Sequence, residues 1–121
     1  MIIVVEDYPI VSMHVKNVLE RAGYTVPATF ASGEEFIDYL ENADPDLVLM
    51  DVMLEGELDG IKTIDILRNK HKFPVIFLTA LSDTDSVSRI ANIKNSTLIN
   101  KPFDEAQLVS AVRQAVGEGF N

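Results

Sequence analysis

Cysteine and tryptophan are absent from this sequence of 121 residues. Without cysteine the chain has no disulfide, thiolate metal site or iron–sulfur cluster, and the absence fits a reducing compartment. Long hydrophobic runs are missing too, because runs such as residues 2–5 and 47–50 fall far short of the roughly 18 residues of a membrane span. No basic and apolar leader opens the chain. We therefore expect a cytoplasmic protein without a secretory signal or membrane contact.

Positive charge is scarce, with 10 Lys and Arg residues against 19 Asp and Glu residues and a net charge of −9. Such a chain repels phosphate backbones, so we expect no direct contact with nucleic acid. Hydrophobic residues make up 47% of the sequence, which is enough to build a core in a chain of this length. The composition predicts one domain over residues 1–121.

Short apolar runs alternate with longer amphipathic runs along the whole chain, a pattern that predicts an α/β fold with helices on both faces of a parallel sheet. Pro27 cannot donate a hydrogen bond to a strand ladder, so the second strand is expected to lie at an edge of the sheet or to be broken at Pro27. The five expected strands are residues 2–5, 25–28, 46–50, 75–78 and 97–99.

Capping residues, prolines and glycines mark the expected helices. The third helix is expected over residues 59–72, and the fourth is expected to bury Val87, Ile90 and Ala91. Residues 117–121 are expected to be a frayed end. The expected boundary residues are Pro9 and Gly23 for the first helix, Ser32 with Glu35 in a capping box for the second, Asp83 or Ser82 for the fourth, and Asp104 with Gln107 for the fifth.

Polar side chains follow four of the five expected strands. Glu6 and Asp7 follow the first strand, Asp51 the third, Thr79 the fourth and Lys101 the fifth. Because the carboxyl ends of parallel strands meet at one edge of a sheet, these side chains are expected to lie together. Singly, each has an ordinary explanation, such as helix entry for Asp7 or strand propensity for Thr79.

Three carboxylates in one confined site repel one another unless a cation compensates their charge. The candidate ligands are all oxygen atoms, which favours Mg²⁺, with Mn²⁺ as the alternative, over Zn²⁺ or Cu²⁺. With Lys101 added, the formal charges balance and the site accepts an anionic phosphoryl group. Asp51 ends the most apolar strand and is the best-placed nucleophile for forming an aspartyl phosphate. Thr79 and Lys101 would stabilise the transferred oxygens.

Four short strings carry a family resemblance: VVED at residues 4–7, LVLMD at 47–51, FLTA at 77–80 and KPF at 101–103. No string is specific alone, but their order and spacing resemble those of the receiver domain of a two-component response regulator. The resemblance covers the whole chain. It implies a flavodoxin-like (βα)5 fold, with a five-stranded parallel sheet between two helical layers in strand order 2-1-3-4-5.

The resemblance also implies a function: Mg²⁺-dependent phosphoryl transfer from the phosphohistidine of a sensor histidine kinase, or from a phosphotransfer protein. The phosphorylated form would switch the surface of the fourth helix, fifth strand and fifth helix, through which a homodimer is also conceivable. The domain would assist its own phosphorylation and dephosphorylation without being an enzyme. The implied site comprises Asp51 as phosphoacceptor; Glu6, Asp7, Asp51 and the backbone carbonyl of Met53 as metal ligands; Thr79, Ala80 and Lys101 around the phosphoryl group; and a cis peptide bond between Lys101 and Pro102.

Two departures from the family pattern stand out. The loop after Asp51 lacks the usual proline and is one residue longer, with Gly56 able to adopt a positive φ. Leu98 occupies the position where the family usually has a switching Tyr or Phe, so the output is expected to use another readout. Met53 and Leu81 are apolar and cannot orient an attacking water, which predicts slow dephosphorylation.

Three alternatives remain open. A pseudo-receiver would bind partners without phosphorylation, although the retention of all five polar strand-end residues argues against it. A phosphohydrolase would have a second acid two residues after the nucleophile, where Met53 stands. A flavin-binding protein of the same fold would have a phosphate loop after the first strand, where Glu6 and Asp7 would repel the phosphate. His14 and His71 follow no strand and are assigned no role.

Overall fold

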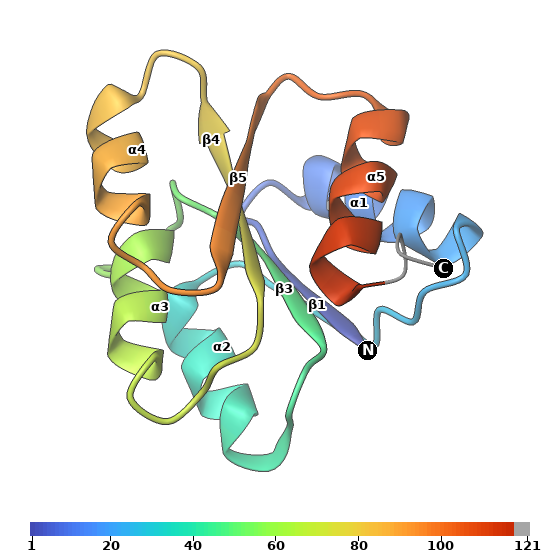
Figure 1. Ribbon diagram of the computed structural model, residues 1–121. Helices are drawn as coiled ribbons and strands as arrows, with labels where there is room; N and C mark the ends of the chain where they lie inside the picture. The colour runs from blue at the N-terminus through green and yellow to red at the C-terminus, as the bar shows by residue number, and fades with distance from the viewer. Residues whose placement is uncertain (118–121) are drawn as a thin grey trace.

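The computed structural model describes residues 1–117 and contains one sheet of five parallel strands in the order β2-β1-β3-β4-β5 (Figure 1). This architecture confirms the predicted α/β class and the flavodoxin-like strand order. The strands are β1 (Ile2–Val5), β2 (Ala28–Phe30), β3 (Leu47–Asp51), β4 (Val75–Ala80) and β5 (Ser96–Lys101).

Helices cover both faces of the sheet (Figure 1). Successive strand residues point to opposite faces, so Ile3 and Val5 pack in one hydrophobic cluster with α2, α3 and α4, while Ile2 and Val4 pack in the other with α1 and α5. No helix within residues 1–117 is long and apolar enough to cross a membrane. The helices are α1 (Pro9–Arg21), α2 (Gly33–Tyr39), continued by the 3₁₀ turn η1 (Leu40–Asn42), α3 (Gly60–Leu67), α4 (Thr84–Ile90) and α5 (Glu105–Val116).

Strand β2 lies at the sheet edge, as Pro27 predicts, but the expected range of residues 25–28 was wrong. The ladder begins at Ala28, which pairs with Ile3, because Pro27 has no N–H to contribute. Thr25 lies outside the strand and makes one hydrogen bond to the sheet, accepting from the backbone N–H of Ile2 at 2.8 Å. Strand β1 has the expected bounds, and β3, β4 and β5 differ from theirs by one or two residues at an end.

Two helix predictions also need correction. Helix α3 ends at Leu67 rather than near residue 72, because no further apolar residue continues its buried face before Phe73. Helix α4 does not bury Val87, which is 41% exposed, and Ala91 lies exposed beyond the end of the helix. This short helix buries only Ser86 and Ile90.

The helix caps match their expected residues with one difference. The Ser32 hydroxyl accepts from the N–H of Glu35, but the Glu35 carboxylate meets the Ser32 hydroxyl rather than its backbone, so this capping box is incomplete. Asp83, not Ser82, caps α4. Asp104 and Gln107 form a full capping box. Gly117 ends α5 with φ of 81°, while the rest of the expected frayed end, residues 118–121, lies outside the described residues.

Candidate functional site

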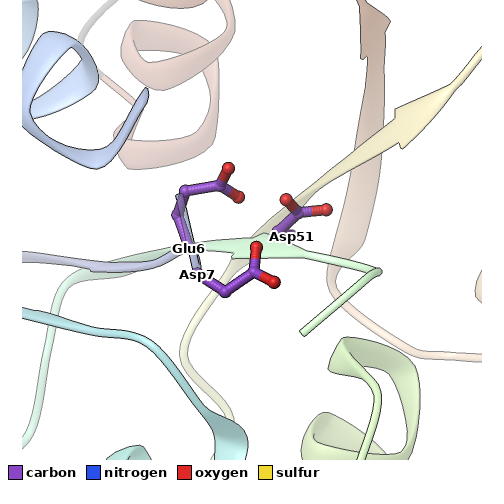
Figure 2. Close-up of side chains that lie close together, drawn as sticks. All are labelled: Glu6, Asp7 and Asp51. Carbon is purple, nitrogen blue, oxygen red and sulfur yellow. The ribbon is translucent and has the colours of Figure 1, made fainter. Parts of the chain in front are cut away.

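Three carboxylates gather where β1 and β3 end. Glu6 and Asp7 directly follow β1, Asp51 is the last residue of β3, and one carboxylate oxygen from each lies within 4.8 Å of the others (Figure 2). The register explains this arrangement, because Val5 pairs with Met50 and the next residue on each strand emerges at the same sheet edge. The structure therefore brings together the three carboxylates that the sequence placed at strand ends.

The backbone around Asp51 is closely packed. The N–H of Gly60, the first residue of α3, donates to the carbonyl of Val52 at 2.9 Å. A Cβ atom at Gly60 would lie 2.1 Å from the backbone oxygen of Asp51, so only glycine fits there. The start of α3 is thereby pressed against the end of β3, which limits how far the Asp51 backbone can shift.

Lys101 supplies the positive charge of the site. Its Nζ lies 2.8 Å from Oδ2 of Asp51 and 3.8 Å from Oε1 of Glu6, so it hydrogen bonds to the first and only pairs electrostatically with the second. Burial by itself lowers the pKa of Lys101, but the hydrogen bond and charge of Asp51, with further help from Glu6, outweigh burial and raise it. Lys101 therefore remains a cation.

Glu6 is the unsatisfied group of the site. Its side chain is fully buried, and neither carboxylate oxygen has a hydrogen-bond partner within residues 1–117. Burial, followed by the neighbouring Asp51 carboxylate, raises the pKa of Glu6 from 4.5 to about 8, and Lys101 only partly opposes this rise. A buried carboxylate without a donor is costly, and a cation placed among the three acids would remove that cost.

Thr79 and Ala80 lie at the end of β4, next to Asp51. Leu78 pairs with Asp51 in the sheet, so Thr79 stands one residue further toward the same edge, and Ala80 pairs with Lys101 on β5. Thr79 is buried, and its hydroxyl oxygen has no hydrogen-bond partner in the described part of the chain. It is thus a second unsatisfied polar group beside the acidic cluster.

The remaining predicted residues surround this cluster. The N–H of Met53 donates to Oδ1 of Asp51 at 3.1 Å, while the Met53 and Leu81 side chains are 73% and 75% exposed. The peptide bond between Lys101 and Pro102 is cis. Leu98 lies away from the acids, half-buried against the hydrophobic cluster on the side of α2, α3 and α4.

Sequence reasoning missed two contacts of the loop between β3 and α3. Glu34 of α2 accepts a hydrogen bond from the N–H of Glu57, and Asp59 forms an ion pair with Arg89 of α4 at 3.0 Å. The partners are separated by 23 and 30 residues, so no local pattern indicates them. The one available signal was Asp59 itself, whose side chain caps α3.

The fold and the site together define a class: a five-stranded parallel α/β domain with a buried acidic cluster and one lysine at the carboxyl edge of its sheet. The family described as the response regulator receiver domain matches residues 2–113. The chain belongs to this family, whose members serve two-component signalling and interact with histidine kinases or phosphotransfer proteins.

Individual relatives agree with this assignment. The chain is 30% identical to the transcriptional regulatory protein PdtaR of Mycobacterium tuberculosis over 115 residues, covering 95% of this chain and 56% of PdtaR. It is 32% identical to the protein CcdB of Bacillus subtilis, covering 96% of this chain and 97% of CcdB. The chain therefore spans about half the length of PdtaR but nearly all of CcdB.

Solved structures show the same fold. A receiver domain of a signal transduction histidine kinase from Syntrophus aciditrophicus superposes with a TM-score of 0.86 at 32% identity, covering 99% of this chain and 92% of that chain. The receiver domain of NtrX from Brucella abortus gives a TM-score of 0.87 at 25% identity, covering 97% and 98%.

Proposed function

We propose that this domain accepts a phosphoryl group on Asp51 from the phosphohistidine of a sensor histidine kinase or phosphotransfer protein, in a reaction that requires Mg²⁺. The observation that carries this proposal is the fully buried carboxylate of Glu6, which lies beside Asp51 and Lys101 but has no hydrogen-bond partner within residues 1–117. A site built only for stability would pair such a group. A buried acid without a hydrogen-bond donor, next to a lysine bonded to Asp51, fits a site completed by a cation and an anion.

The residues fit a magnesium site. Glu6, Asp7 and Asp51 offer oxygen atoms within 4.8 Å of one another, and hard oxygen donors are the ligands that Mg²⁺ prefers, with Mn²⁺ as the alternative. The backbone carbonyl of Met53 is the fourth proposed ligand. When bound, the cation would offset the charge of the acids and draw electron density from the phosphoryl oxygens.

The chain's own residues then perform the transfer. A carboxylate oxygen of Asp51 forms the new bond to phosphorus while the phosphorus–nitrogen bond of the donor breaks, and the released imidazole takes its proton from solvent. Lys101, which hydrogen bonds to Asp51, and the Thr79 hydroxyl, which has no hydrogen-bond partner within residues 1–117, are placed to bind the transferred oxygens, together with the backbone N–H of Ala80. The domain carries the group as a signal rather than turning over a substrate.

The phosphorylated form would change the surface of α4, β5 and α5, starting at Thr79. Leu98 has no hydroxyl or aromatic ring to report that change, so the readout would pass through α4, which buries one apolar side chain, Ile90, where α5 buries two, Leu108 and Val112. We also propose that the domain can form a homodimer through the same surface and that it acts in the cytoplasm. The net charge of −9 favours protein partners over nucleic acid.

Phosphoramidate, a small donor with a phosphorus–nitrogen bond, tests the proposal. Incubation with Mg²⁺ should produce a ³¹P signal of a protein acyl phosphate that hydroxylamine removes, and Asp51→Asn should abolish it. A hydroxylamine-resistant signal would place the group on another residue type. If no adduct forms and Mg²⁺ does not bind, the domain is a pseudo-receiver that recruits partners without phosphorylation.

A further inference from the structure

The loop between Asp51 and α3 leads directly out of the site and contains Met53. Its two ends are held by the fold, because the Val52 carbonyl accepts from Gly60 and Asp59 caps α3 by accepting from the N–H of Lys62. The middle of this loop, residues 55–58, lies outside the five-stranded sheet. The middle of the loop therefore needs support from another element.

Helix α2 provides that support. Oε2 of Glu34 accepts a hydrogen bond from the N–H of Glu57 at 3.0 Å, and the N–H of Leu58 also points to this carboxylate. Ser32, which caps the same helix, forms an isolated parallel bridge with Glu55. The beginning of α2 thus contacts the loop at Glu55 through the Ser32 backbone, and at Glu57 and Leu58 through the Glu34 carboxylate.

Gly56 shows how closely the loop lies on Glu34. Its φ is +90°, which L side chains rarely adopt, and a Cβ atom there would lie 2.8 Å and 2.9 Å from the two carboxylate oxygens of Glu34. The loop backbone therefore lies directly against the carboxylate, and a glycine is needed for that approach.

We propose that Glu34 is a positioning residue for the magnesium site, holding the loop so that the Met53 peptide stays beside Asp51. The Met53 N–H already bonds to Oδ1 of Asp51 at 3.1 Å, which holds the residue that carries the proposed carbonyl ligand close to the acids. This inference rests on the proposed function, because it concerns the Met53 carbonyl as a ligand. Glu34 itself makes no contact with the three acids and acts through the loop backbone.

The carboxylate of Glu34 accepts its hydrogen bonds in the ionised form. Hydrogen bonds from the backbone N–H groups of Glu57, Glu34 itself and Leu58 lower its pKa, so it stays charged at neutral pH. Removing it also removes one negative charge near a cation site. Glu55, an exposed acid on the same loop whose side chain makes no hydrogen bond or ion pair within residues 1–117, is the matched control for that charge.

The test is a Mg²⁺ titration of the wild type and the variants Glu34→Ala, Glu34→Gln and Glu55→Gln. Glu34→Ala should weaken Mg²⁺ binding about tenfold, the range seen when residues supporting metal ligands are lost. Glu34→Gln retains one acceptor oxygen and should fall between Glu34→Ala and the wild type. Glu55→Gln should remain within about twofold of the wild type, as expected for an exposed charge.

Hydrogen exchange of the metal-free proteins separates positioning from loss of charge. The amides of Glu57 and Leu58 should exchange faster in Glu34→Ala, while the amides of β1 and β3 keep their wild-type rates. At saturating Mg²⁺ the rate of phosphorylation by acetyl phosphate should return to the wild-type value, because Glu34 does not touch the reacting atoms. Gly56→Ala should reproduce the weaker Mg²⁺ binding by displacing the same contact.

The outcomes are distinguishable. Wild-type Mg²⁺ affinity in Glu34→Ala, or equal losses in Glu34→Ala and Glu55→Gln, would overturn the positioning role and leave the proposed function standing. A wild type that binds no Mg²⁺ would overturn both. If Glu34→Ala fails to fold, Gly56→Ala decides: weaker Mg²⁺ binding supports the positioning role, and unchanged binding overturns it.

Discussion

Two charged side chains at opposite edges of the same sheet are treated in opposite ways. At the carboxyl edge, Glu6 is fully buried and its oxygens have no hydrogen-bond partner within residues 1–117. At the amino edge, Arg68 donates to the carbonyls of Lys94, His71 and Asn95 at 3.1 to 3.3 Å, and its guanidinium lies 5.4 Å from the Phe73 ring centre. The Glu6 carboxyl group lacks a hydrogen-bond partner in the described part of the chain, whereas the Arg68 guanidinium has three.

This difference indicates what each edge does. Arg68 ties the end of α3 to the turns before β4 and β5, so its hydrogen bonds stabilise the fold. Glu6 lies where a buried acid destabilises the metal-free domain, which is tolerable only if the site gains a ligand that offsets it. Removing the Arg68 side chain should therefore lower the stability of the metal-free domain, whereas neutralising Glu6 should raise it.

The largest effect is expected at the amino edge. Arg68→Ala removes three hydrogen bonds and a stacked cation and should destabilise the domain by about 2 kcal/mol, measured by urea unfolding. Lys72→Ala, which removes a neighbouring exposed charge, should change stability by less than about 0.5 kcal/mol. Equal effects of the two variants would contradict the role given to Arg68. Mg²⁺ binding should be unchanged in both.

At the carboxyl edge, Glu6→Gln should stabilise the metal-free domain by about 1 kcal/mol at pH 8, because it removes a buried negative charge beside Asp51. The same change should abolish stabilisation by Mg²⁺. Thermal unfolding with and without Mg²⁺ measures both effects. Glu20→Gln on the exposed side of α1 is the control and should alter neither. A Glu6→Gln variant less stable than the wild type without metal would break the comparison.

The stability of the metal-free domain should also depend on pH, because ionised Glu6 destabilises it. The pKa of Glu6 is about 8 in the folded domain against 4.5 for the free side chain, so the folded state holds a proton that the unfolded state has released. Between these values the stability of the metal-free domain should fall as pH rises. This decline should be absent in Glu6→Gln; identical pH profiles for the two proteins would contradict the assignment.

The smallest effect concerns the exposed rim. Met53 offers no group to orient a water molecule, so Met53→Asn should speed loss of the phosphoryl group about threefold, equivalent to roughly 0.7 kcal/mol in the barrier. The decay of phosphorylated protein measures it. Met13→Asn, at an exposed methionine of α1, should leave the rate unchanged. An unchanged rate in Met53→Asn would show that the apolar rim does not slow hydrolysis.

Much of the acidic edge could be predicted from the sequence because it depends on strand ends alone. Glu6, Asp7 and Asp51 follow strands whose apolar runs are clear, and parallel pairing brings those ends together. Their chemical roles remain predictions. The order of the strands was predicted from the family resemblance, and the position of β2 at an edge followed from Pro27.

The amino edge could not be predicted in this way. The contacts of Arg68 join backbone carbonyls up to 27 residues away, and a carbonyl has no sequence signature. For the same reason the sequence could not predict the contact of Glu34 with the loop. It also could not predict that Val87 is exposed, because the apolar spacing of Val87 alone suggested burial. Local patterns predict elements, whereas these contacts depend on how elements pack.

We propose that Asp51 at the acidic edge accepts a phosphoryl group only when a metal ion is bound. Intact mass after incubation with acetyl phosphate, with and without Mg²⁺, tests this proposal for the wild type and Asp51→Asn. We expect a single phosphoryl mass that appears only with Mg²⁺ and only when Asp51 is present. An adduct that forms without Mg²⁺ or persists in Asp51→Asn would contradict it.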